Sequence, residues 1–316
     1  MGLLNWLSAP GAPDAATRVL IERAIAAVDP LLKTVGSYER KLAPAVYHAI
    51  DYCESLAARI PGPFEISRAA FAADPLVHAL FASADDIGTM LARSQCVREH
   101  LVGPAAPMAG QCCALLGMRH REKSGFGARL TGQLVCADQP QRTLHFEDHT
   151  LAEPAPDLER ARSGLREAMF DGLIRSFAVH VAEVREERAG LRQEQALASA
   201  RERVAGRAES QSRRYADLQR RLRATADALS PPRLLDALTD CLMSPEPYLR
   251  LEPVTFAVDR AGIIAGAGQG DADTLHFVEL NSRDQRRWVV MLVRIEREEA
   301  RRAVEGQEAA RRHIVI

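Results

Sequence analysis

The chain lacks the motifs by which common nucleotide and catalytic sites are recognised. It contains no GxxxxGK[ST] phosphate loop and no GxSxG nucleophile elbow. The glycines at 262, 266, 268 and 270 do not have GxGxxG spacing, and Asp271 to Asp273 lead into an expected strand rather than a helix. The sequence therefore gives no basis for phosphate-loop or serine-hydrolase chemistry, and we expect no cofactor.

Lysine is scarce, since Lys33, Lys41 and Lys123 are the only three and the other 38 of the 41 basic residues (41 − 3) are arginine. Together with abundant alanine, this bias is typical of GC-rich coding and predicts a bacterial protein. The formal net charge is -1, so no excess of positive charge favours a nucleic-acid partner. We therefore expect no nucleic-acid binding.

Cysteine spacing excludes the usual metal and disulfide frameworks. The chain has six cysteines but no CxxC pair, and Cys112 and Cys113 are adjacent. Such cysteines are typical of small buried apolar residues in a reducing compartment. The sequence thus predicts a cytoplasmic location.

No segment has the 18 or more uninterrupted apolar residues that a membrane helix needs, so we expect no integral membrane span. A short apolar peptide, containing Leu3, Leu4, Trp6 and Leu7, opens the chain and precedes a Pro- and Gly-rich tether. This peptide raises the hypothesis of peripheral membrane contact.

What the chain does contain is a long proline-free run from Asp157 to Ser230. Apolar residues recur in it every three or four positions, which is the spacing of one stripe on a helix. The second half of the stripe predicts a self-association or partner interface at Val204, Tyr215, Leu218, Leu222 and Leu229.

The run is too long to be one straight helix inside a compact domain, because 74 residues would span about 110 Å. Leu191 and Leu197 are six positions apart, which shifts the register between the two halves. The other faces carry mixed Arg and Glu charges, as on a solvated helix surface. A coiled-coil arm and a helical hairpin that doubles back near Gly190 or Gly206 both fit this pattern.

Short helices punctuated by prolines are expected before the run, at about 14–120, and Ser83 with Asp86 has the spacing of a capping box. The last of these helices is expected at about 111–121. Two strands, 128–136 and 142–150, are then predicted around a turn at 138–141.

After the run, Pro231 and Pro232 start another helix, and strands are predicted at 254–258, 275–280 and 288–293. The last strand is apolar on both alternating faces and is expected to be the most buried one. A charged helix is expected from about 296 to 312.

These observations predict a mostly helical α+β fold. We expect an N-terminal helical bundle with a β-hairpin, a long coiled-coil-like helix and a small C-terminal antiparallel α+β module. The expected ranges are an apolar peptide and tether at 1–13, a helical domain at 14–122, a β-hairpin segment at 123–156, the long helix at 157–230 and the α+β module at 231–316.

One constellation suggests chemistry. If the second hairpin strand alternates regularly, His145, Glu147 and His149 share one face, and two imidazoles with a carboxylate are a ligand set for zinc or non-haem iron. The three span about 14 Å of backbone, and the spacing does not match HExxH.

Three functional hypotheses follow. The first is a non-catalytic bacterial adaptor or regulatory scaffold that self-associates or binds a protein partner through the long helix. The second is a metal-dependent enzyme or metal sensor that uses His145, Glu147 and His149. The third is a peripheral membrane-associated protein held by its apolar N-terminal peptide.

Overall fold

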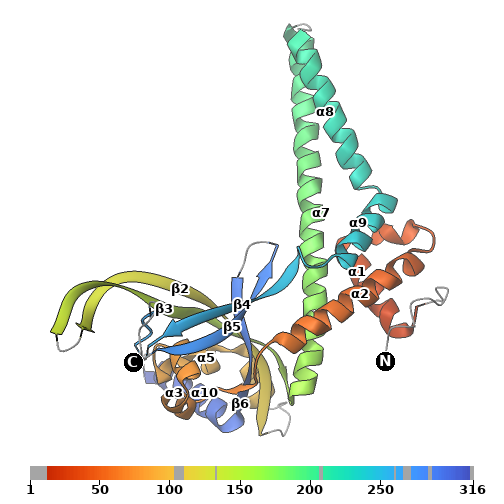
Figure 1. Cartoon of the computed structure of the whole chain (residues 1–316). Coiled ribbons are helices and arrows are strands. Elements are labelled where there is room, and N and C mark those ends of the chain that lie inside the picture. Colours follow the sequence, from red (N-terminus) through yellow and green to blue (C-terminus); the bar gives the residue numbers. More distant parts are fainter. Residues whose placement is uncertain are drawn as a thin grey trace. The chain divides into compact units, whose positions relative to one another are not determined.

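The computed structural model describes residues 13–102, 110–131, 134–205, 209–259, 261–265, 272–283 and 287–313. Helices and a single mixed sheet make up these ranges, which confirms the predicted α+β class (Figure 1). The chain divides into two compact units, Met1–Cys53 with Met169–Leu249 and Glu54–Ala168 with Arg250–Ile316. Each unit therefore combines stretches that are far apart in the sequence.

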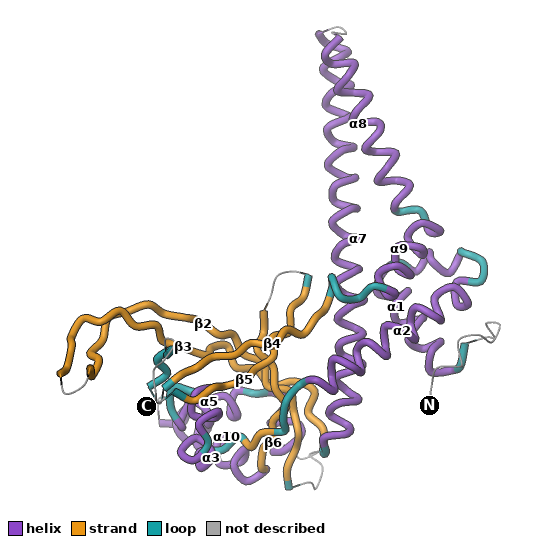
Figure 2. The backbone as a smooth tube through the Cα atoms, viewed as in Figure 1, coloured by secondary structure: helices purple, strands orange, loops and turns teal. Residues whose placement is uncertain are grey.

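The first unit is helical (Figure 2). It contains α1 (Ala15–Val28), the 3-10 helix η1 (Pro30–Thr34), α8 (Glu209–Ala228) and α9 (Pro231–Met243), with most of α2 (Tyr38–Arg59) and of α7 (Leu158–Ala205). The residues of α2 after Cys53 and of α7 before Met169 belong to the second unit. Asp14 caps α1 by accepting a hydrogen bond from the Thr17 amide at 2.7 Å. The buried core of this unit includes Ile21, Ile25, Leu42, Val46, Phe170, Leu173, Ile174, Phe177, Leu235 and Leu238.

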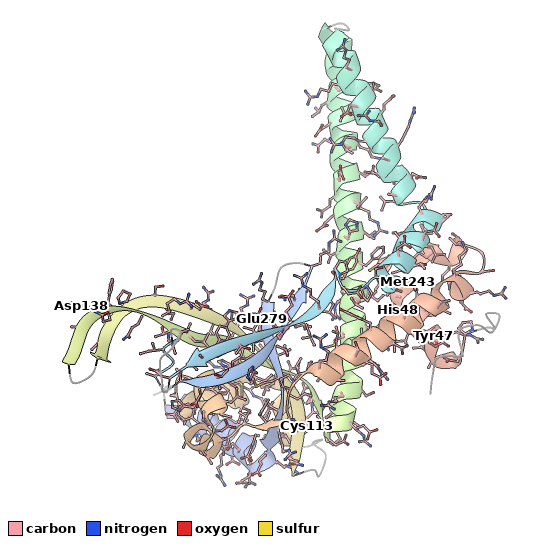
Figure 3. The ribbon with its side chains drawn as sticks, viewed as in Figure 1. Tyr47, His48, Cys113, Asp138, Met243 and Glu279 are labelled. Atoms are coloured by element: carbon pink, nitrogen blue, oxygen red, sulfur yellow. The ribbon has the colours of Figure 1, made fainter. Side chains whose placement is uncertain are left out.

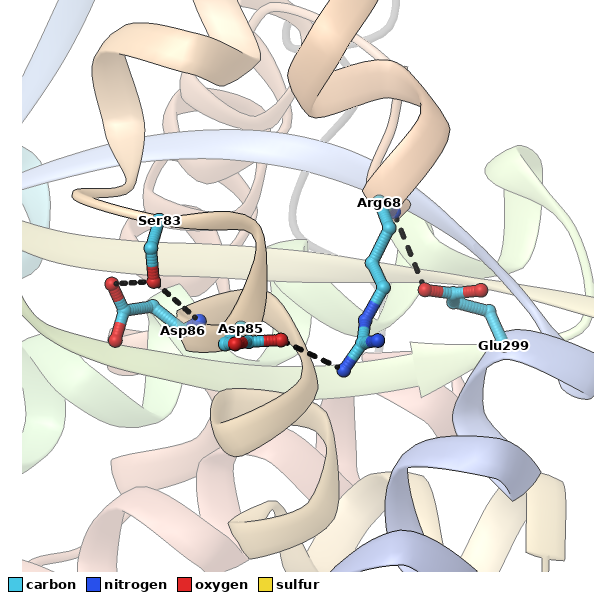
Figure 4. Close-up of polar contacts among 5 residues, drawn as sticks. All are labelled: Arg68, Ser83, Asp85, Asp86 and Glu299. Carbon is cyan, nitrogen blue, oxygen red and sulfur yellow. Dashed lines mark hydrogen bonds and ion pairs between the residues drawn. The ribbon is translucent and has the colours of Figure 1, made fainter.

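The second unit contains a group of short helices. These are α3 (Arg68–Ala73), α4 (Pro75–Leu80), α5 (Ala84–Arg93), α6 (Gln95–Val97), the π-helix η2 (Arg98–Val102) and the longer α10 (Arg297–His313). Ser83 caps α5 as predicted, since its Oγ accepts from the Asp86 amide and donates to the Asp86 carboxylate at 2.9 Å (Figure 4). Arg68 joins neighbouring helices, because its side chain lies 3.1 Å from Asp85 and its amide donates to Glu299 (Figure 4).

Six strands form the sheet of the second unit, in the order β3-β2-β6-β5-β4 with β1 beside β6. Their bounds are β1 (Phe64–Glu65), β2 (Gln111–Thr131), β3 (Leu134–Ala155), β4 (Leu249–Val258), β5 (Asp273–Ser282) and β6 (Arg287–Glu296). The three strands predicted near the C-terminus are confirmed as β4, β5 and β6. The last of these is central, with five consecutive buried residues from Val289 to Val293, as its apolar run predicted.

The two edges of this sheet are joined through residues 261–265. Ile263 bridges to Thr143 of β3, and Ile264 bridges to Val258 of β4. The Leu144 amide also donates to the Gly262 carbonyl at 2.8 Å, and Gly262 has a φ of +73°, which favours glycine. The sheet therefore curls so that β3 and β4 are connected.

The structure corrects the prediction for the segment that begins at Gln111. Residues 111–121 form the start of β2 and not a helix, and the β2–β3 hairpin turns after Thr131 rather than at 138–141. Asp138 lies within β3, on the long ribbon (Figure 3). The segment from Cys112 to Met118 is buried or half-buried on both faces of the sheet, and such a continuous apolar run does not distinguish a strand from a helix.

Candidate functional site

The long proline-free run folds back on itself as an antiparallel helical hairpin of α7 and α8 (Figure 1). The Glu187 carboxylate on α7 lies 2.9 Å from the Arg221 guanidinium on α8. The side-chain amide of Gln195 on α7 donates to the Tyr215 hydroxyl on α8 at 3.4 Å. A residue farther along α7 thus meets a residue earlier in α8, which defines the antiparallel direction. Helix α7 continues through Gly190 to Ala205, and α8 runs back from Glu209. Gly206, the other position at which the sequence predicted a reversal, lies outside the described residues.

The predicted interface stripe lies largely in the seam of this hairpin. Leu218 is only 4% exposed, and Tyr215, Leu222 and Leu229 are half-buried. The Val204 side chain is outside the described residues. Leu218 is therefore covered within the chain itself, and the partner interface at this stripe stays a prediction.

A different side of α7 carries exposed apolar side chains. Val179 is 58% exposed and Leu197 is 53% exposed. They are 18 residues apart, which is five helical turns, so they lie on the same side of the helix. The buried seam residue Leu191 is six positions from Leu197, about 120° around the helix axis. Gly190 is on the outer side, and a Cβ built on it meets no atom within 4 Å.

We call Val179, Gly190 and Leu197 the outer face of α7. The sequence signal for this face was the six-residue step between Leu191 and Leu197. That step marks two separate stripes on one continuous helix, one covered by α8 and one left open.

The structure does not bring the three predicted metal ligands together. The His145 Nε2 atom lies 2.9 Å from the Thr143 hydroxyl, and the Glu147 carboxylate pairs with Arg121. The His149 Nε2 atom lies 2.8 Å from the Leu80 carbonyl. Among the residues that the structure describes, no group of three His, Cys, Asp or Glu side chains could hold a metal ion.

A β-bulge explains why regular alternation misplaced these ligands. Gly117 pairs with Thr150 and Arg119 pairs with Glu147, so two residues of β3 lie opposite one residue of β2. One of the two, Asp148, has a φ of +57°. The extra residue turns the next side chain, His149, to the opposite face of the sheet.

His149 consequently packs on the core side of the second unit. Its ring stacks on Phe81 with the centroids 4.6 Å apart. Burial lowers the pKa of the His149 imidazole below its usual value, so the ring is held in its neutral form. The physical role of this histidine is packing with one hydrogen bond.

Strand β5 carries a buried acidic residue that was not among the residues predicted from the sequence. Glu279, which is labelled in Figure 3, is 3% exposed. Its Oε1 atom lies 2.8 Å from Nδ1 of His120 on β2, although the contact lacks hydrogen-bond geometry. The ring of His120 packs against Phe256. Glu279 follows the core residue Phe277 by two positions, so alternation along the strand puts both side chains on the same face. This spacing was the sequence signal that Glu279 is buried. Buried carboxyl groups normally have a polar neighbour, and the ring of His120 is such a neighbour for Glu279.

The cysteines in the described part of the chain are free thiols and most of them are buried. Burial raises the pKa of Cys53 and of Cys112 to about 12. A thiol with such a pKa is a poor nucleophile at neutral pH. These two residues are therefore structural, in agreement with the packing role that their spacing predicted.

Comparison with known proteins gives no match to a family model, to a curated protein or to a solved structure. Within the described ranges, no helix has the length and apolar character needed to cross a membrane. The surface geometry is therefore the basis for a functional proposal.

Proposed function

We propose that this protein is a non-catalytic scaffold or adaptor that self-associates through the outer face of α7. The observation that supports the proposal is the pair of large apolar side chains, Val179 and Leu197, exposed on one side of a helix whose other stripe is already covered. Single exposed apolar residues are common on protein surfaces, and we infer a contact here because Val179 and Leu197 share one helical stripe, on which another helix could pack.

The occupant that fits this face is a second copy of the chain. A two-fold axis through the outer face of α7, at the height of Arg188 along the helix, would place two α7 helices antiparallel, because Val179 and Leu197 are each nine residues from Arg188 (188 − 179 and 197 − 188). Arg188 itself is two and a half turns from each and lies on the opposite side of the helix. Val179 of each copy would then lie opposite Leu197 of the other, as an isologous interface requires. Gly190 would lie opposite Glu186 and leave room for its side chain, since both are two residues from Arg188.

The two-fold contact covers four apolar side chains, Val179 and Leu197 of each copy, and each of them is about half exposed in the isolated chain. Complete burial of a Val or Leu side chain stabilises by about 1.5 to 3 kcal/mol, so burying the remaining half of four contributes about 4 kcal/mol. Association also costs translational and rotational freedom, so these residues support a dimer that dissociates on dilution.

The cytoplasmic location is part of the same proposal. It is supported by the free thiols of Cys53, Cys96, Cys112, Cys113 and Cys241, because an oxidising compartment favours paired cysteines. The residues of the membrane hypothesis, Leu3, Leu4, Trp6 and Leu7, are outside the described ranges, and the proposal does not use them.

Light scattering of the purified protein at micromolar concentration tests self-association. We expect a mass near twice the 34.7 kDa of one chain for the wild type, and a monomer for Leu197→Glu. Leu31→Glu is the matched control, because Leu31 is also an exposed leucine of the first unit, at 60%, but lies on η1. A monomeric wild type, or equal loss of the dimer in both variants, would refute the proposal.

A further inference from the structure

A cavity of about 530 Å³ lies in the second unit, between α4 and the curled sheet. Small-molecule sites in proteins commonly occupy such volumes. The residues that line it come from the α3–α4 region, from β3, from the ends of β4 and β5, and from residues 261–262. Every one of these segments belongs to the second unit, so the cavity is built by one compact body.

The cavity is lined in part by apolar side chains of the core. Leu80, Phe81, Leu144, Val258 and Leu275 line it and are each less than 10% exposed. These side chains are held by both the sheet and α4, so they form a fixed apolar surface. An apolar surface of this kind favours the flat or branched hydrocarbon part of a ligand.

The ionisable side chains that line the cavity are three carboxylates and two imidazoles. Asp74, Asp259 and Asp273 line it together with His78 and His145, and no Lys or Arg of the described residues does. Asp74 uses Oδ1 to accept from the Leu76 amide, and Asp259 uses Oδ1 to accept from the amides of Ala261 and Ile263. These bonds fix the two carboxyl groups, and within the described part of the chain no hydrogen bond to the Oδ2 atom of either is present.

We propose that this cavity binds a small organic cation, an amine or guanidine with an aromatic or branched apolar body. The apolar side chains hold the body, and the carboxylates of Asp259 and Asp273 attract the cationic group. A negatively charged ligand is disfavoured by the same carboxylates, which makes the charge of the ligand the selective feature. The proposal is independent of self-association through α7.

Calorimetric titration with three indoles of matched shape tests the charge selection. Tryptamine is cationic at neutral pH, tryptophol is neutral and indole-3-acetate is anionic. We expect binding of tryptamine, at least about fivefold weaker binding of tryptophol, and no measurable binding of indole-3-acetate. Equal affinity for tryptamine and tryptophol, or no binding of tryptamine at millimolar concentration, would overturn the proposal.

Two variants locate the site. Asp273→Asn removes an exposed carboxylate that makes no hydrogen bond or ion pair with described residues, so the fold should tolerate it; we expect tryptamine binding to weaken about threefold. Ala73→Phe adds a large side chain to the cavity wall from an exposed position and should abolish binding. Far-ultraviolet circular dichroism confirms folding of each variant. Unchanged tryptamine affinity in both folded variants would place the ligand elsewhere and refute the assignment.

Discussion

Two leucine truncations in the α7–α8 hairpin should differ in their effect on the free energy of unfolding. Leu218 is 4% exposed between the helices, whereas Leu197 is 53% exposed on the outer face. Truncation of a buried leucine to alanine costs about 2 to 5 kcal/mol, from lost apolar burial and from the cavity that remains. Because the seam is formed between two helices, α7 and α8, the neighbouring side chains can partly close the cavity, and we expect a value near the lower limit.

We therefore expect Leu218→Ala to lower the free energy of unfolding by about 2.5 kcal/mol and Leu197→Ala to change it by less than about 0.5 kcal/mol. Urea unfolding followed by circular dichroism measures both values. The protein should be diluted until light scattering shows a monomer, so that dissociation does not contribute to the unfolding free energy.

The comparison has a clear negative outcome. If Leu218→Ala unfolds at the wild-type urea concentration while Leu197→Ala is strongly destabilised, the assignment of the covered and open stripes is reversed. The proposal that α7 presents Val179 and Leu197 to a second copy would then be wrong, because those residues would stabilise the isolated chain.

Three further outcomes follow from local geometry. Gly62→Ala should destabilise by more than about 2 kcal/mol in urea unfolding, since Gly62 has a φ of +114° and an added Cβ would lie 2.2 Å from the Leu292 carbonyl oxygen. The lowered pKa of His149 keeps its ring neutral in the native state, whereas the same ring takes up a proton below about pH 6.5 in the unfolded chain. The free energy of unfolding therefore falls with acidification, and His149→Phe should lose less of this free energy than the wild type between about pH 7.5 and 5.5. Cys53 and Cys112, whose pKa values are raised to about 12, should resist iodoacetamide at neutral pH until urea unfolds the chain, as mass spectrometry of the labelled protein would show.

Elements with a clear period and a boundary residue were predictable from the sequence. Asp14 and Ser83 accept the hydrogen bonds of helix caps, and Pro231 begins α9. The strand at 288–293 was predicted to be the most buried because both of its faces are apolar, and β6 is the centre of the sheet. In these cases the local signal and the tertiary environment agree.

The segment that begins at Gln111 and the candidate metal face were not predictable by the same reasoning. The first is buried on both faces, which removes the alternation that identifies a half-buried strand. The second depends on a bulge at Asp148, which inserts one residue and reverses the face of His149. The cavity beside α4 depends on residues from separate segments meeting in space, and no local pattern specifies such a meeting.

Cysteine cross-linking across the proposed two-fold axis tests the central claim most directly. A chain carrying Val179→Cys, mixed with a chain carrying Leu197→Cys, should form a disulfide-linked dimer under mild oxidation. Either variant alone should not, because identical positions nine residues from the axis are about 27 Å apart along antiparallel helices. Cross-linking of each variant with itself, or no cross-linking of the mixture, would contradict an antiparallel contact through the outer face of α7.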